Sequence, residues 1–330
     1  MRRAGVLFCL VAVAAVVAAP PCVHAHGLIG KRFLPATLTT DDPFVADELS
    51  LPTVRYFKNR ATSDNPATRE RDFSAEFSKR LSPDLGVSLG GSFKSLDPED
   101  QKKSTVGFDN MEVALKYVFF KDAEHEALVA AGVGWDVGGT GNRRRVDAES
   151  FDTITPSLFF GKGFGDLPDS LDFAKPLALT GVFGVAMPTT GSSNRTKIGD
   201  DGDIDVEREL HPDVAKWGFS LQYNLQYLQS FVRDVGLPAP LNRMIPLVEL
   251  SLQTPLDRMK TGHTTGTVNP GIIWFGRYVQ LGVEALVPIN GPSGKNLGVI
   301  GQLHFYLDDI WPQVFTWTPF HGILCPTQPR

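Results

Sequence analysis

Apolar and polar residues alternate along much of the chain with a period of two. In the segment 216–229, every second residue from Trp217 to Tyr227 is a large apolar or aromatic one, and the residues between them are polar or small. Residues two apart share a face of a β-strand, whereas an α-helix scatters them around its circumference. The pattern therefore predicts a strand with one apolar and one polar face.

Further segments alternate in the same way, or are apolar enough on both faces to be buried strands. They are 50–57, 72–81, 85–94, 109–119, 127–137, 151–162, 177–187, 245–254, 266–275, 279–284 and 299–305. Most are about ten residues long, which suits a tilted strand that crosses a bilayer, whereas soluble strands average nearer five or six. The sequence thus predicts an all-β fold: an antiparallel up-and-down transmembrane β-barrel of about 12 strands.

The connections between these segments alternate in length, as outer-membrane barrels require. If the first strand rises from the periplasm, three of the inward turns are tight, at 82–84, around 121–123 and at 276–278. The outward set contains the longest connection of all, 188–215. We expect this loop to lie on the outer surface.

The N-terminal 25 residues have the organisation of a cleaved secretory signal. Arg2 and Arg3 precede an apolar run over 6–19, and Val23 and Ala25 are the small residues of a cleavage site. The run is shorter than the roughly 20 residues of a membrane-spanning helix. The expected organisation is a signal at 1–25, an N-terminal periplasmic or plug segment at 26–49, a barrel at 50–307 and a C-terminal tail at 308–330.

Composition and charge agree with a barrel without identifying one. The 330 residues are 42% hydrophobic and carry a formal net charge of −5. No basic excess exists to neutralise nucleic-acid phosphates, and the apolar content is too high for a disordered chain. The partners we expect are outer-membrane lipid, a small-molecule solute and the outer-membrane assembly machinery, with no nucleic acid.

The alternation assigns a polar set of side chains to the inside of the barrel. The residues predicted to line the lumen are Asp72, Glu76, Lys94, Glu112, Lys116, Lys216, Gln222, Asn224, Gln226, Glu249, Glu284, Gln302 and His304. Charges of both signs occur among them. The sequence therefore leaves open a hydrated path for solutes or an interior closed by salt bridges.

Metal binding and catalysis have weak signals. Asp201, Asp203 and Asp205 begin like a calcium-binding EF-hand loop, but Val206 and Pro212 stand where that loop needs Gly and a closing Glu. His304 is a lumen candidate for acid–base chemistry, but the chain contains no G-x-S-x-G nucleophile motif. We predict no metal, no cofactor and no enzymatic activity.

With an export signal, alternating ten-residue strands and tight inward turns, the chain resembles bacterial outer-membrane β-barrel proteins. More narrowly, it resembles the exported barrels described as transporters or as members of the MetA pathway of phenol degradation, over most of 50–307. The resemblance implies a channel or transporter for small, often hydrophobic or aromatic, solutes in the outer membrane of a Gram-negative bacterium. It leaves two alternatives: a non-conducting structural or surface-binding barrel, and a soluble periplasmic all-β binding protein.

Many outer-membrane barrels end on a final strand with a terminal aromatic residue, which the assembly machinery recognises. In this chain the last alternating strand closes at Phe305-Tyr306-Leu307, and about twenty residues follow it. The resemblance therefore implies that the assembly signal is read inside the chain.

Overall fold

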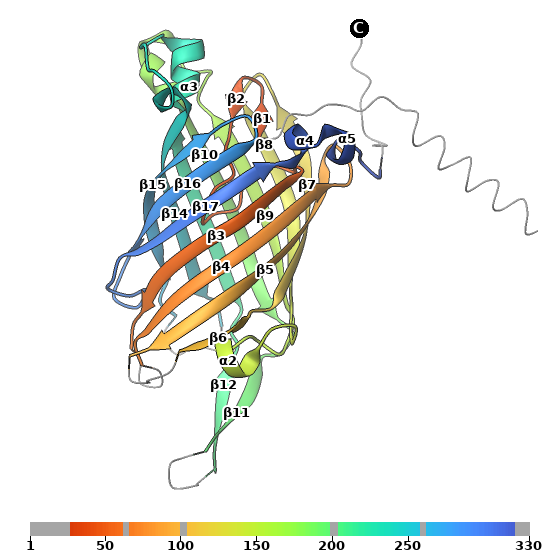
Figure 1. Cartoon of the computed structure of the whole chain (residues 1–330), viewed down its shortest axis with the longest axis vertical. Coiled ribbons are helices and arrows are strands. Elements are labelled where there is room, and N and C mark those ends of the chain that lie inside the picture. Colours follow the sequence, from red (N-terminus) through yellow and green to blue (C-terminus); the bar gives the residue numbers. More distant parts are fainter. Residues whose placement is uncertain (1–26, 62–65, 100–103, 199–203, 258–261, 321–330) are drawn as a thin grey trace, which may run out of the picture.

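The structure is a computed structural model that describes residues 27–61, 66–99, 104–198, 204–257 and 262–320 (Figure 1). The predicted signal at 1–25, the last ten residues of the predicted tail, and the metal candidates Asp201 and Asp203 lie outside the described residues. Among the residues described, no helix is both long and apolar enough to cross a membrane.

Twelve antiparallel strands form one closed barrel, which confirms the predicted fold class. Each strand pairs with its neighbours along the chain, and the first strand pairs with the last to close the sheet. The strands are β3 (Glu48–Asn59), β4 (Thr68–Arg80), β5 (Leu85–Pro98), β7 (Met111–Asp122), β8 (Ala127–Val137), β9 (Thr153–Gly163), β10 (Leu177–Pro188), β13 (Val214–Tyr223), β14 (Met244–Pro255), β15 (Thr265–Phe275), β16 (Val279–Pro288) and β17 (Gly298–Tyr306).

The two faces of the strands differ as the alternation predicts. Large apolar side chains on the outer face are widely exposed, among them Phe73, Leu115, Phe183, Val248 and Leu281 at 42–49%. Polar neighbours one position away are fully enclosed inside the barrel, including Ser220, Glu249 and Glu284. The sheet thus turns its apolar side outward, which is the arrangement of barrels that sit in lipid.

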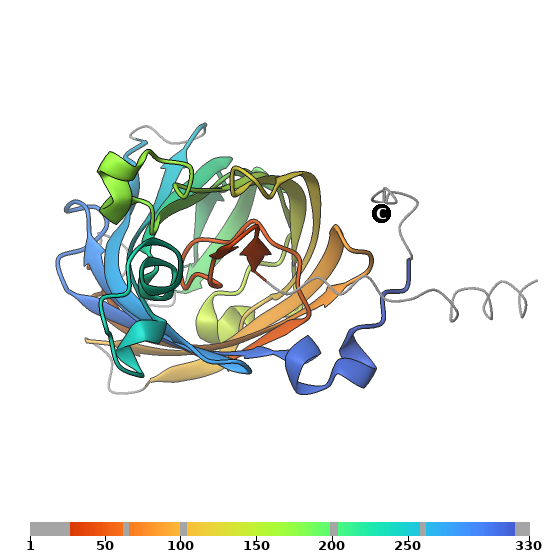
Figure 2. The same ribbon diagram turned by 90° about the horizontal axis from the view of Figure 1, so that it is seen from above.

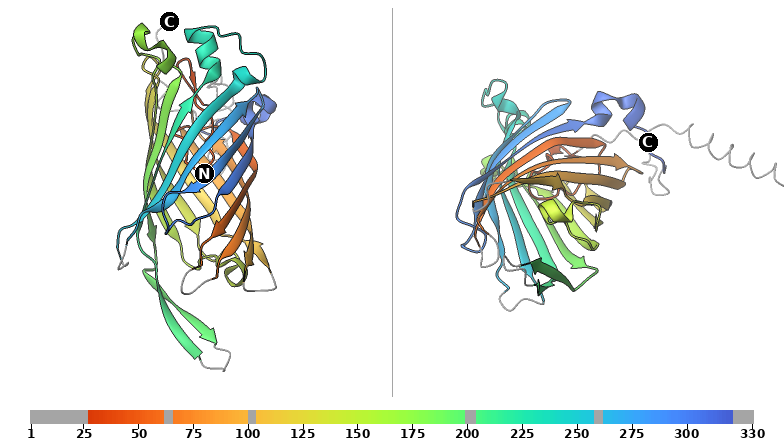
Figure 3. Two further views of the ribbon diagram at one scale, coloured as in Figure 1. Left: turned by 90° about the vertical axis from the view of Figure 1, so that its left-hand side faces the viewer. Right: turned by 60° about the horizontal axis from the view of Figure 1, so that its bottom comes forward.

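The three tightest turns, after β4, β7 and β15, lie at one end of the barrel, and the longest connection, between β10 and β13, lies at the other (Figures 1 and 3). Two longer connections, between β9 and β10 and between β13 and β14, share the end with the tight turns. The end with the tight turns, which we call the plug end, carries β1 (Leu28–Ile29), β2 (Arg32–Phe33), η1 (Asp169–Ala174), α3 (Leu225–Tyr227), η2 (Leu228–Val232), η3 (Leu241–Arg243), α4 (Leu307–Ile310) and α5 (Pro312–Phe315). The other end, the hairpin end, carries β6 (Thr105–Phe108), α2 (Arg143–Val146), β11 (Ser192–Ile198) and β12 (Ile204–Leu210).

The predicted strand at 216–229 is wrong beyond Tyr223. Asn224 begins a helical turn there, and its side chain accepts a hydrogen bond from the backbone N–H of Tyr227 at 3.0 Å. An Asn side chain in this position satisfies a backbone donor that a helix start leaves unpaired. Tyr227, which continues the apolar alternation, and Leu228, which follows it, are buried at the plug end of the barrel and not on a strand face.

The long connection 188–215 contains a structure that the alternation did not reveal. Residues 192–198 and 204–210 pair as the antiparallel strands β11 and β12, which project beyond the barrel (Figure 3). Polar residues dominate β11, and the apolar residues of β12 are only Ile204, Val206 and Leu210, at alternate positions, so the sequence signal of this hairpin is short.

The chain before the first barrel strand folds into the barrel interior. After the β1–β2 hairpin at the plug end, residues 34–47, which we call the plug, lie inside the ring of strands (Figure 2). Leu34 joins a core cluster with Val118 and Phe159 on the barrel wall, and Leu38 joins another with Ile245 and Ile273. The plug therefore has its own apolar anchors inside the lumen.

Several glycines on the barrel wall make room for the plug, among them Gly86 and Gly218. A Cβ atom on Gly86 would lie 1.9 Å from the side chain of Val45, and one on Gly218 would lie 2.6 Å from the side chain of Thr40. Glycine in a strand often marks a place where another backbone approaches closely. These two positions on β5 and β13 fit that explanation.

Candidate functional site in the plugged lumen

The lumen around the plug contains two polar cavities that share part of their lining. Their volumes are about 400 and 480 Å³. Both are bounded by the plug tip at Thr39, Thr40 and Asp41 and by Glu76 and Glu112 of the wall. The plug therefore forms one surface of the solvent space in the barrel.

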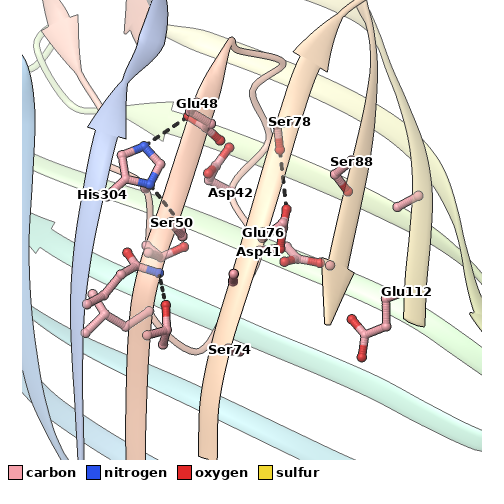
Figure 4. Close-up of a pocket in the computed structure, with 18 of the residues that line it drawn as sticks. Asp41, Asp42, Glu48, Ser50, Ser74, Glu76, Ser78, Ser88, Glu112 and His304 are labelled. Atoms are coloured by element: carbon pink, nitrogen blue, oxygen red, sulfur yellow. Dashed lines mark hydrogen bonds and ion pairs between the residues drawn. The ribbon is translucent and has the colours of Figure 1, made fainter. Parts of the chain in front are cut away.

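The first cavity is rich in carboxyl groups (Figure 4). Asp41 and Asp42 come from the plug, and Glu48, Glu76 and Glu112 come from β3, β4 and β7. Carboxylates brought together from three strands and an inserted segment create a negative potential where they face one cavity.

His304 of β17 borders the same cavity and is 1% exposed. Its Nδ1 lies 2.9 Å from the hydroxyl of Ser50, and its Nε2 lies 3.2 Å from a carboxylate oxygen of Glu48 (Figure 4). Ser50 and His304 are direct cross-strand partners at the β17–β3 closure of the barrel. The imidazole thus joins the first and last strands.

Two basic side chains that border the first cavity form ion pairs with other carboxylates. Arg55 pairs with Glu70 and Asp72 at 3.1 and 2.7 Å, and Lys94 pairs with Asp109. Among the described residues, none forms an ion pair with Asp41, Glu76 or Glu112. These three carboxyl groups border both cavities without a basic partner.

Lys116 ties the plug to the wall between the two cavities. Its amino group donates a hydrogen bond to the backbone carbonyl of Asp42 at 2.7 Å and lies 4.6 Å from the centre of the Phe159 ring. Burial raises the pKa of Asp42 to about 6, although the charge of Lys116 acts in the opposite direction. The Asp42 carboxyl therefore loses its charge in mildly acidic solution.

Glu249 of β14 holds the plug tip. Its carboxylate, which is completely buried, accepts hydrogen bonds from the backbone N–H groups of Leu38, Thr39 and Thr40 at 2.8–3.0 Å. It also accepts from the hydroxyl groups of Thr39 and Thr40. One side chain of the wall thus satisfies three consecutive backbone donors of a loop that has no strand partner of its own.

Neighbouring strands reinforce this attachment. Asn269 of β15 donates to the hydroxyl of Thr39 at 2.8 Å, and Gln280 of β16 donates to the carbonyl of Ala36 at 2.6 Å. Glu284 of β16, 1% exposed, is buried beside Glu249. The wall formed by β14–β16 is therefore the face on which the plug is seated.

Arg32 fixes the start of the plug at the plug end. Its guanidinium is fully buried, pairs with Glu126 at 2.9 Å and donates to the carbonyls of Lys175 and Pro176 at 2.5 and 2.7 Å. It also lies 3.8 Å from the centre of the Tyr227 ring. Burial, together with the hydrogen bond to Glu126, raises the pKa of Tyr227 to about 12.

The structure divides the predicted lumen residues into those that border the cavities, those that are buried on the inner wall, and two that lie beyond the end of their strand. Those that border the cavities are Asp72, Glu76, Lys94, Glu112, Lys116, Lys216, Gln302 and His304. Gln222, Glu249 and Glu284 are buried on the inner wall, away from the cavities. Of the three predicted metal candidates, Asp201, Asp203 and Asp205, only Asp205 lies in a described segment, on β12.

Two of the predicted lumen residues are wrong, because the strand ends before them. Asn224 caps α3 and donates to the carbonyl of Phe33, and Gln226 is an exposed residue of α3 outside the lumen. The prediction also missed Asp41, Asp42 and Arg32. These residues precede the strands, so no alternation assigns them to a face of the barrel.

The comparisons with known proteins concern the fold alone. No family model and no curated protein matches the chain. A NanC porin structure is 9% identical, with 77% of this chain and 98% of that chain aligned and a TM-score of 0.43. The translocator domain of the autotransporter NalP from Neisseria meningitidis is 10% identical, with coverage of 78% and 86% and a TM-score of 0.41.

A deletion mutant of the monoaromatic hydrocarbon channel TodX is 9% identical, with coverage of 78% and 88% and a TM-score of 0.38. The fold class rests on this chain's own strand pairing and outer face. A closed, up-and-down antiparallel barrel with an apolar exterior is an outer-membrane type of β-barrel.

Proposed function

We propose that the protein is an outer-membrane channel for small solutes and that residues 34–47 close it from inside. The observation that carries this proposal is a polar, cavity-containing lumen inside a barrel with an apolar exterior. The barrel strands are 9–14 residues long, which matches a tilted crossing of the hydrocarbon layer.

The ends of the barrel support an orientation. Outer-membrane barrels have short periplasmic turns and longer external loops. The tight turns lie at the plug end and the β11–β12 hairpin lies at the opposite end. We place the plug end in the periplasm and the β11–β12 hairpin on the outer side of the membrane.

The seated plug also favours a second candidate, a barrel that does not conduct. Glu249 and Arg32 hold the plug by buried, charge-assisted contacts, and such contacts give a permanently filled barrel if the plug never leaves. A soluble periplasmic binding protein is a poorer match, because many large apolar side chains are exposed around the whole barrel.

Ion current through planar bilayers tests the proposed function. The refolded full-length protein is expected to produce discrete, mostly closed channels, and a variant with a weakened plug attachment is expected to produce open ones. No current from either protein would leave the non-conducting barrel as the better description. Recovery of the native protein from the soluble periplasmic fraction would exclude both barrel functions.

We further propose that the channel prefers cations, because Asp41, Glu76 and Glu112 face the cavities without an ion pair. Rings of carboxylates favour cations in pores. In a salt gradient near 0.1 M, the reversal potential is expected to show cation preference in the native protein. The double substitution Glu76→Gln and Glu112→Gln is expected to reduce that preference by several-fold.

The matched control for ion preference is Glu70→Gln. Glu70 is also a barrel carboxylate, but it is paired with Arg55 and borders neither cavity. An unchanged reversal potential in the double variant would contradict the assignment of these carboxylates as the charges that a permeating ion meets.

A further inference from the structure

The C-terminal segment leaves the barrel and runs along its outside. After β17 ends at Tyr306, residues 307–320, which we call the tail, form α4 and α5 and lie outside the ring of strands at the plug end (Figure 2). Asp308 pairs with Arg80 at 2.9 Å, and Arg80 also pairs with Asp47 at 2.7 Å. This buried network fixes the beginning of the tail.

The rest of the tail is attached to β4 and to the turn after it. The amino group of Lys79 donates to the carbonyls of Phe315 and Trp317 at 3.1 and 2.6 Å. The backbone N–H of Phe320 donates to the carbonyl of Leu81 at 2.8 Å. The tail is therefore held in a defined position against the barrel wall.

The tail nevertheless exposes its largest apolar side chains. Trp311, Val314, Trp317 and Phe320 are 54, 61, 54 and 61% exposed. Exposing this much apolar surface to water is unfavourable by about 25 cal/mol per Å². The tail is fixed to the barrel by the buried ion pair of Asp308 with Arg80, yet it exposes four large apolar side chains. Such exposed apolar surface indicates a binding partner.

The apolar surface of the tail continues into the outer face of the barrel. The ring of Phe315 packs edge-on against Phe77, which belongs to that face, with 6.2 Å between ring centres. At the same end of the barrel, Phe119, Phe120 and Tyr278 are 53, 47 and 45% exposed. Outer-membrane barrels have girdles of aromatic side chains where they pass through the lipid headgroup region. Trp is particularly enriched in that region.

We propose that the tail is a membrane-interface anchor, with Trp311, Val314, Trp317 and Phe320 inserted at the boundary between headgroups and acyl chains. The occupant is the phospholipid leaflet at the plug end of the barrel. This inference rests on the proposed location of the barrel in a membrane. In this proposal the tail has a function of its own, because it extends the lipid-binding surface beyond the barrel wall.

Tryptophan quenching by brominated phospholipid tests the anchor. Of the five Trp residues, Trp311 and Trp317 belong to the tail, and Trp135, Trp217 and Trp274 belong to barrel strands. One variant changes the three barrel residues to Phe, and the other changes the two tail residues to Phe. Each is reconstituted in vesicles with or without bromine near the headgroup end of the acyl chains.

We expect the brominated lipid to reduce the emission of both variants at least about twofold. If the barrel Trp residues are quenched and the tail Trp residues are not, the tail does not reach lipid and the inference is overturned, while the membrane barrel stands. If neither set is quenched in protein that migrates as a folded barrel on an unheated gel, the membrane location itself fails.

Discussion

Glu249→Ala is expected to open the channel. The substitution removes the acceptor for the backbone N–H groups of Leu38, Thr39 and Thr40, and each hydrogen bond to a charged group contributes about 1.5–3 kcal/mol. A loss of only about 1.4 kcal/mol shifts the closed-to-open ratio about tenfold. Single-channel recordings should therefore show an open probability at least about tenfold above that of the native protein.

The control for this prediction is Glu112→Gln. Glu112 is a lumen carboxyl on β7 that makes no hydrogen bond with the plug in the described structure, so its loss should change ion preference and leave open probability as it was. The two variants thus distinguish the carboxyl group that holds the plug from the one that attracts the permeating ion. An open probability of Glu249→Ala equal to that of the native protein would mean that the plug is not the gate.

Arg32→Met is expected to destabilise the plug end of the barrel by about 3–5 kcal/mol. Removing one partner of a buried ion pair leaves the other, Glu126, as a buried charge without compensation. The carbonyls of Lys175 and Pro176 lose a donor at the same time. Urea unfolding of the protein in lipid vesicles, followed by tryptophan emission, measures the change in the free energy of unfolding.

The adjacent Lys31→Met is the control for Arg32→Met. Lys31 is exposed and lies 5.7 Å from the centre of the Phe231 ring, a contact that contributes about 0.5–1 kcal/mol. Adding Glu126→Gln to Arg32→Met removes the uncompensated charge and should recover part of the lost stability. Equal effects of the Arg32 and Lys31 substitutions would show that the buried pair does not fix the start of the plug.

The barrel was predictable because a membrane imposes one rule on every strand. Lipid selects apolar residues at alternate positions over about ten residues, so each strand carries its own signal in the sequence. The predicted strand was wrong beyond Tyr223. Leu225 and Tyr227 continue the apolar alternation there, but Asn224 begins a helix. Local parity does not distinguish a strand from a buried helical turn of the same composition.

The plug was not predictable in the same way, because its contacts are distant in sequence and have no period. Leu38 and Glu249 are 211 positions apart, and Glu249 binds backbone groups that every residue possesses. Alternation places Glu249 on the inner face, but nothing in the sequence shows that a loop occupies that face. Gly86 and Gly218 are the sequence positions that the plug requires to be small, but this reason is evident only from their contacts with Val45 and Thr40 in the structure.

The central claim, that residues 34–47 occupy the barrel interior, is tested most directly by a disulfide between Val45→Cys and Gly86→Cys. A Cβ atom on Gly86 would lie 3.4 Å from the Cβ atom of Val45, close to the 3.5–4.5 Å of natural disulfides. The native Cys9, Cys22 and Cys325 are changed to Ser, and Val45→Cys with Gly134→Cys is the control pair. Oxidation of the membrane-embedded protein should cross-link the first pair almost completely, as a reductant-sensitive gel shift, and should leave the control pair unlinked. Equal cross-linking of both pairs, or none of the first, would contradict a plug seated against β5.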